Sequence, residues 1–195
     1  EELYFCPSTG GVKSLRAMSY HPATGAMYIP LNLHCETAEF LPVEKREGGG
    51  GTGGVRERQN HFHPDSPGQL GEFQALDIRT GETLWKNRRR APYNTAALTT
   101  AGDLVFVGDL DRYIFAYDAE TGETRWQSRL TTMANGYPIT YAVDDTQYVA
   151  FVAGNPLGGA SWAATVPNDL LPELRNPRNA GNAIFVFALP EGDSE

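Results

Sequence analysis

The strongest constraint on the fold of this chain is a 13-residue segment that occurs twice. Residues 73–85 read FQALDIRTGETLW, and residues 114–126, 41 positions later, read IFAYDAETGETRW. Both fit the pattern Ala-x-Asp-x-x-Thr-Gly-x-x-x-Trp. A strand, a tight turn and a second strand that recur about every 40 residues are typical of stacked four-stranded sheets, because one such unit cannot bury its apolar faces alone. The repeat predicts a β-propeller.

Each copy of the repeat contains residues suited to a turn and to sheet packing. A short carboxylate can accept backbone N–H groups across the turn, and a glycine can supply a positive φ. A tryptophan in the returning strand can bury roughly 150–250 Å² between adjacent sheets. We therefore predict structural docking roles for two sets of residues, which are Asp77, Gly81 and Trp85 in the first copy and Asp118, Gly122 and Trp126 in the second.

The length predicts an incomplete propeller. At about 40 residues per blade, 195 residues provide about three to four four-stranded blades. Closed propellers contain 4–8 blades. The chain also begins without Met, a basic region or an apolar signal core. We therefore expect an all-β, partial β-propeller that is a piece of a longer protein.

The charge of the chain argues against a nucleic-acid partner. The formal net charge is −8, whereas phosphate binding requires clustered cations. The one cationic run, residues 88–90, is interpreted as a solvated loop between blades. No apolar run reaches the 18 residues of a membrane span.

One segment is interpreted as an insertion. Residues 44–69 are rich in glycine and poor in apolar residues, which predicts a long loop. His61, His63 and Asp65 lie within it, and we interpret these histidines as solvated rather than metal-bound. The two cysteines, Cys6 and Cys35, are able to form one disulfide, but their spacing does not establish it.

Three sequence segments together resemble the C-terminal part of the quinoprotein alcohol dehydrogenases. They are the doubled Trp motif, LTTAGDLVFVG at 98–108, and the run from GYPITY at 136 to QYVAFVAG ending at 154. Members of that family are eight-bladed propellers that bind pyrroloquinoline quinone (PQQ). The resemblance covers nearly the whole chain, so residues 1–195 are expected to be one C-terminal propeller part with the 44–69 insertion inside it.

The resemblance implies a periplasmic enzyme that oxidises a primary alcohol or a sugar hydroxyl by hydride transfer to PQQ. It implies a Ca²⁺ or lanthanide ion beside the quinone, and an external electron acceptor such as a cytochrome c or ubiquinone. In the family, the metal ligands and the catalytic Asp lie in earlier blades. No catalytic or metal-binding residue is therefore assigned in this chain.

Two segments are candidates for contact with the quinone. The family often has Gly-Gly-x-Asn-Trp where this chain has Gly-Gly-Val-Lys-Ser-Leu at 10–15, so the Asn-Trp pair is missing. Lys13 or Ser14 can instead donate a hydrogen bond to a quinone carboxylate or carbonyl. The alternative is that this segment is a solvated turn. The second candidate is the loop after residue 154, with Asn155 and Pro156.

A rival function is a non-catalytic, PQQ-like propeller that binds protein partners at its rim. The missing Asn-Trp pair favours it, whereas the match at 98–108 and 136–154 favours the dehydrogenase. A hydrolase or nucleotide-binding domain finds no support, because neither Gly-x-Ser-x-Gly nor a phosphate-binding Gly-x-x-x-x-Gly-Lys-Ser/Thr occurs.

Overall fold

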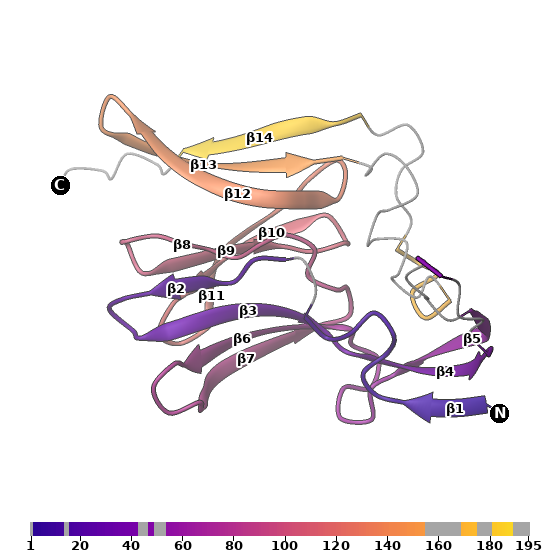
Figure 1. Cartoon of the computed structure of the whole chain (residues 1–195). Helices are drawn as coiled ribbons and strands as arrows, with labels where there is room; N and C mark the ends of the chain where they lie inside the picture. The colour runs from indigo at the N-terminus through magenta and orange to yellow at the C-terminus, as the bar shows by residue number, and fades with distance from the viewer. Residues whose placement is uncertain are drawn as a thin grey trace.

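The computed structural model describes residues 2–13, 16–42, 47–48, 54–154, 169–174 and 181–188. These residues form fourteen strands in four antiparallel sheets. Three of the sheets are stacked one above another, and the fourth projects from one end of the stack (Figure 1). The predicted all-β, partial propeller is confirmed.

The three stacked sheets are the blades, and each contains strands in nearly sequential order. The first blade contains β2 (Ser19–His21), β3 (Ala26–Asn32), β6 (Gly71–Asp77) and β7 (Thr83–Arg89). The second contains β8 (Leu98–Thr99), β9 (Leu104–Gly108), β10 (Tyr113–Asp118) and β11 (Thr124–Arg129). The third contains β12 (Ala134–Val143), β13 (Thr146–Ala153) and β14 (Ala183–Ala188). Two blades therefore have the predicted four strands, and the third has three among the described residues.

The edges of the blades identify the axis of the propeller. Strands β2, β8 and β12 are each at one edge of their sheet, and β8 contacts both β2 and β12. Backbone hydrogen bonds also join the segment before β8 to its neighbours. Ala97 N donates to Ala17 O, before β2, at 3.0 Å, and Ala96 N donates to Gly136 O, in β12, at 2.9 Å. Strands β2, β8 and β12 are thus the innermost strands.

Trp85 lies between the first and second blades. Its ring centroid is 5.7 Å from that of Tyr28 in its own blade and 6.3 Å from that of Tyr117 in the next. Its indole Nε1 donates to Ala119 O at 3.0 Å. The apolar core between these blades is made mainly of buried aromatic and small residues, among them Tyr28, Phe73, Ala75, Tyr93, Phe115 and Tyr117.

Both repeat turns have the same geometry. In the first, Asp77 Oδ1 accepts the backbone N–H of Arg79 at 2.8 Å, and Gly81 has a φ of 75°. In the second, Asp118 Oδ1 accepts the equivalent backbone N–H of Glu120 at 3.0 Å, and Gly122 has a φ of 75°. The shared geometry explains why the two segments have Asp and Gly at equal spacing.

Trp126 faces the third blade and is less well covered than Trp85. Its ring centroid is 5.0 Å from that of Phe187 on β14, yet 37% of its surface remains exposed. It borders an open apolar groove of about 560 Å³ between the second and third blades, lined also by Leu104, Phe106, Ala116, Val149 and Phe187. The groove lies where the described residues of the third blade provide no fourth strand.

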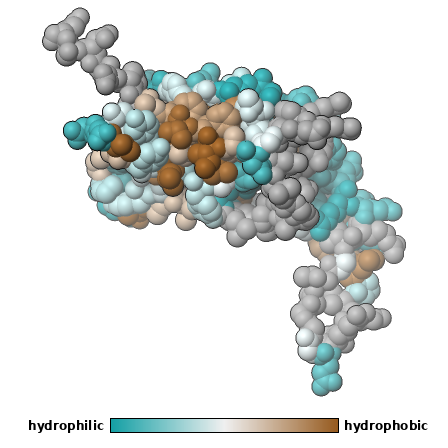
Figure 2. All heavy atoms as spheres, turned by 90° about the horizontal axis from the view of Figure 1, so that it is seen from above, coloured by the Kyte–Doolittle hydropathy of each residue, from teal (hydrophilic) through white to brown (hydrophobic). Residues whose placement is uncertain are grey.

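The outer face of the third blade exposes an apolar surface. Figure 2, which views the molecule from above, shows this brown patch over the top sheet of Figure 1. The side chains that form it alternate along β12, β13 and β14, and they are Ile139, Tyr141, Val143, Val152, Ile184 and Val186. Ile184 is 70% exposed.

The fourth sheet corrects part of the predicted loop at 44–69. It contains β1 (Glu2–Phe5), β4 (His34–Phe40) and β5 (Val55–Phe62), and β5 lies inside the range assigned to the insertion. Residues 57–59 of β5 are exposed polar residues. The strand therefore has no alternation of apolar and polar residues, the feature from which a half-buried strand is recognised.

The cationic run at 88–90 also differs from the expectation of a solvated loop. Arg88 and Arg89 belong to β7, and each of the three arginines pairs with a carboxylate from another segment. Arg89 Nε lies 3.0 Å from the fully buried Oδ2 of Asp109 in the second blade. Arg89 thus helps to join the two blades.

The described residues contain no helix long and apolar enough to cross a membrane.

Candidate functional site

Three chain segments meet at the end of the propeller where the innermost strands begin. Residues 16–18 lead into β2, residues 93–97 lead into β8, and Ala134 begins β12. The side chain of Asn94 connects all three, because its Oδ1 accepts from Arg16 Nη2 at 3.0 Å and its Nδ2 donates to Ala134 O at 2.7 Å. These contacts define the axial site as the surroundings of Arg16, Asn94 and Ala134.

Arg16 is the main charged group described at the axial site. Its side chain is half-buried, and desolvation lowers its pKa to about 10, so it remains protonated at neutral pH. Its Nε is buried without a hydrogen-bond partner. A half-buried guanidinium with an unpartnered donor suits an anionic group such as a carboxylate of PQQ.

Lys13 lies beside Arg16. Its Nζ donates to the backbone carbonyl of Arg16. Desolvation lowers the pKa of Lys13, and repulsion from Arg16 lowers it further. Of the predicted quinone contacts, Lys13 is thus at the axial site, whereas Ser14 lies outside the described residues.

The second predicted contact segment begins at the same end of the propeller. Ala153, the last residue of β13, pairs with Ala134, and Gly154 N donates to Met133 O at 3.0 Å. Asn155 and Pro156 follow Gly154 directly and lie outside the described residues. The antiparallel pairing of β12 and β13 therefore places Gly154, which directly precedes Asn155, at the same end of the blades as Ala134.

The turn before Lys13 is held against the fourth sheet by hydrogen bonds. Ser8 N donates to His34 O at 3.0 Å, and Glu36 Oε2 accepts from Thr9 N at 2.8 Å and from Thr9 Oγ1 at 2.6 Å. Glu36 is buried, and Arg58 Nε lies 3.2 Å from its other oxygen. The fourth sheet thus positions the segment that carries Lys13 and Arg16.

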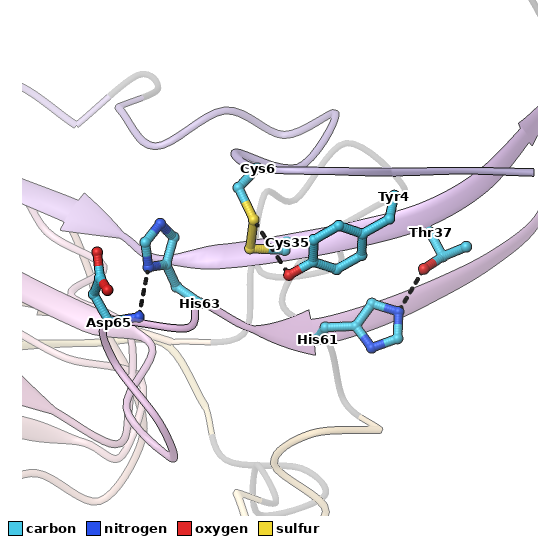
Figure 3. The surroundings of a disulfide bond; sticks show 7 residues. All are labelled: Tyr4, Cys6, Cys35, Thr37, His61, His63 and Asp65. Carbon is cyan, nitrogen blue, oxygen red and sulfur yellow. Dashed lines mark hydrogen bonds between the residues drawn. A yellow bond between two sulfur atoms is a disulfide. The ribbon is translucent and has the colours of Figure 1, made fainter.

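A disulfide joins Cys6 to Cys35 and adds to this attachment (Figure 3). The sequence left this pairing open. Sγ of Cys6 and of Cys35 and a ring nitrogen of His63 lie within 4.8 Å of one another, which is the one such ligand group among the described residues. Because a thiolate is the sulfur species that binds metal, the disulfide leaves neither sulfur as a metal ligand.

The two histidines of β5 and its following turn make different hydrogen bonds. His61 Nε2 lies 2.7 Å from Thr37 Oγ1, and its ring packs against Tyr4. His63 Nδ1 accepts from the backbone N–H of Asp65 at 3.1 Å. Figure 3 shows the two rings apart from each other, with His61 beside Thr37 and His63 near Asp65.

Arg16 and Asn94 are the residues of the axial site that the sequence did not single out. Neither belongs to a motif, and 78 positions separate them. The available signal was only indirect, because Arg16 lies just beyond the Gly-Gly segment and Asn94 just before the 98–108 segment.

Comparison with known proteins gives a consistent picture. Residues 86–149 match the family model described as the glucose/ethanol/alcohol dehydrogenase β-propeller domain. The chain is 31% identical to the quinoprotein ethanol dehydrogenase of Pseudomonas putida over 97% of its own length and 29% of that protein. It is 32% identical to methanol dehydrogenase [cytochrome c] subunit 1 of Methylobacterium organophilum, over 94% of the chain and 31% of that protein.

A solved structure is also similar. A europium-containing methanol dehydrogenase superimposes with a TM-score of 0.77 and 28% identity, over 95% of this chain and 34% of the other. The chain therefore spans about a third of the length of the proteins that it matches.

Proposed function

We propose, from the premise that this chain is a homologue of the quinoprotein alcohol dehydrogenases, that residues 1–195 are the C-terminal part of an eight-bladed PQQ-binding propeller. The parent protein would oxidise a primary alcohol or a sugar hydroxyl. The fold and the family similarity support the propeller and the dehydrogenase class.

The single observation that carries the proposal is the axial site. Two cations, Lys13 and Arg16, lie next to the innermost strands of a chain whose net charge is −8, and Gly154 opens the second candidate loop at the same end. PQQ carries carboxylates, to which Lys and Arg side chains form strong charge-assisted hydrogen bonds. Lys13 would contact the quinone directly, with Ser14, Asn155 and Pro156 as further proposed contacts.

The chemistry that PQQ supplies when bound is the acceptance of a hydride from the alcohol carbon, assisted by a Ca²⁺ or lanthanide ion that acts as a Lewis acid. The residues of this chain would bind and orient the cofactor. The metal ligands and the catalytic Asp are proposed to lie in other blades of the parent.

The acceptor and the compartment are also proposals. Cytochrome c appears in the name of one relative, and we propose a cytochrome c or ubiquinone as the external acceptor. A periplasmic location fits the Cys6–Cys35 disulfide, because disulfides persist in oxidising compartments.

Two surfaces support the proposal that further blades complete the propeller. The exposed apolar face of the third blade (Figure 2) has the character of a sheet face that packs against a neighbouring sheet. The groove beside Trp126 has room for the part of an outer strand that would complete the third blade.

The direct test uses the purified parent protein. It would be incubated with PQQ and either Ca²⁺ or a lanthanide, and dye reduction would be followed with primary alcohols and aldoses. Substrate-dependent dye reduction that requires PQQ is expected. Absence of turnover with every alcohol and aldose would contradict the dehydrogenase assignment.

The second candidate function is a protein-binding scaffold without a cofactor. The observation that favours it is the absence of the Asn-Trp pair at 10–15. This candidate predicts that the parent binds no PQQ, which a titration followed by absorbance would reveal independently of any turnover.

A further inference from the structure

We infer that Arg16 is the residue of this chain that fixes a carboxylate of PQQ, through a planar two-point hydrogen bond, and that Asn94 and Asn32 hold its guanidinium in position for this task. The inference rests on the proposed function. It assigns a role to a residue that no motif marks.

The guanidinium of Arg16 is oriented before any ligand arrives. Its Nη2 donates to Asn94 Oδ1 at 3.0 Å. Its Nη1 donates to Asn32 at 3.0 Å when the side-chain amide of Asn32 is oriented with its oxygen toward Arg16. Asn94 is itself anchored, because its backbone N donates to Gly108 O at 2.8 Å and its Nδ2 to Ala134 O at 2.7 Å.

The charge of Arg16 has no protein counterpart in the described part of the chain. No described carboxylate lies within 4.0 Å of it, although acidic residues outnumber Lys and Arg by 24 to 16. Seven other arginines do pair with a carboxylate, and these are Arg58, Arg79, Arg88, Arg89, Arg90, Arg125 and Arg129. A partly desolvated cation without a counterion is costly, and a bound anion removes that cost.

The unpartnered atom of Arg16 identifies the geometry of the anion. Nη1 and Nη2 each donate one N–H to an asparagine, which leaves a second N–H on each of them, and Nε is buried without any partner. In a guanidinium, Nε–H and one Nη–H point in the same direction and match the two oxygens of a carboxylate. Lys13 cannot provide this geometry, because an ammonium has no planar fork.

The experiment measures PQQ binding by the parent protein without substrate, by quenching of its intrinsic fluorescence. The variants are R16Q, which removes the charge, and R16K, which keeps the charge but loses the fork. R125Q is the matched control, because it removes the same charge from the exposed outer strand β11. Each protein is titrated with PQQ and with its trimethyl ester, in which no carboxylate is free.

We expect R16Q to raise the Kd for PQQ roughly 10- to 100-fold, R16K to raise it less, and R125Q to change it less than about twofold. The preference for PQQ over its ester should shrink in both Arg16 variants. This change in preference separates loss of a carboxylate contact from a general loss of folding, and R16K keeps the comparison available if R16Q does not fold.

Three outcomes overturn the inference. An unchanged preference for PQQ over its ester in R16Q or R16K refutes the role of Arg16 while the proposed function stands. Displacement of PQQ by equimolar inorganic phosphate identifies a general anion site instead. Absence of PQQ binding by the wild-type parent refutes the proposed function, and the inference falls with it.

Discussion

The indole of Trp85 lies against Gly122, so closely that a Cβ at position 122 would stand 2.6 Å from indole Cδ2. Trp85 belongs to the first copy of the repeat and Gly122 to the second. The two copies are therefore coupled, because the turn of one blade provides the flat surface on which the tryptophan of the previous blade rests.

Substitution of Gly122 by Ala should destabilise the protein more than the same substitution at Gly81. Both glycines have a φ of 75°, so both variants incur the same backbone penalty of about 1–2 kcal/mol. At Gly81 no atom lies within 4 Å of the added Cβ, whereas at Gly122 the indole must move. This overpacking adds roughly 1–3 kcal/mol.

The measurement is the midpoint of denaturant unfolding of G122A and G81A. Equal midpoints would show that Trp85 does not rest on Gly122 in solution. We expect a lower unfolding midpoint for G122A than for G81A, accompanied by a change in tryptophan fluorescence.

The Cys6–Cys35 disulfide should stabilise the segment that carries Lys13 and Arg16. It closes a loop with a sequence separation of 29 residues, for which the chain-entropy model gives about 3–4 kcal/mol. The double variant C6A/C35A is expected to unfold at lower denaturant concentration and to be cut earlier by protease near residues 6–16. The control is thiol titration of the unfolded wild type without reductant, which should detect no free thiol; two free thiols would contradict the pairing.

The parts of the fold that repeat could be predicted from the sequence, and the parts held by single long-range contacts could not. Asp77, Gly81 and Trp85 predict a turn and a docking residue because local geometry requires those residue types. Strand β5 was missed because its exposed polar residues carry no period. The pairing of Arg89 with Asp109 depends on how two blades are stacked, which composition does not encode.

The candidate site also contains one part that the sequence marks locally and another that depends on long-range contacts. Lys13 could be singled out from the sequence as a candidate quinone contact because a Gly-Gly segment and a family resemblance marked it. Arg16 and Asn94 come together only when the approaches to β2 and β8 lie side by side. The axial site is therefore a product of the blade arrangement, and a single sequence does not reveal it.

The Asp109 carboxyl should make stability fall as pH rises from about 4 to about 6. Burial raises its pKa from 3.8 to about 6, although the backbone N–H of Tyr113 and the guanidinium of Arg89 favour the ionised form. Because the folded-state pKa lies above the unfolded value, folding is favoured while the group is protonated, and that contribution is lost through this interval. The loss is on the order of 2–3 kcal/mol.

The test compares unfolding midpoints of the wild type and D109N between pH 4 and pH 7. The difference between them should change most steeply between pH 4 and pH 6 and level off as pH 7 is approached. A constant difference would show that the pKa of Asp109 is not raised. D145N is a suitable control, since Asp145 is an exposed carboxylate in the turn between β12 and β13.

Trp126 should contribute as much as Trp85 to the stability of the parent protein if further chain covers the groove beside it. In this chain Trp126 is 37% exposed and borders a groove of about 560 Å³. A fully packed tryptophan costs about 3–5 kcal/mol when replaced by Ala. We therefore expect W126A and W85A to lower the stability of the parent by similar amounts, with both indoles shielded from acrylamide. A W126A variant that loses less than about 1.5 kcal/mol, with its indole freely quenched in the parent, would show that the groove stays open.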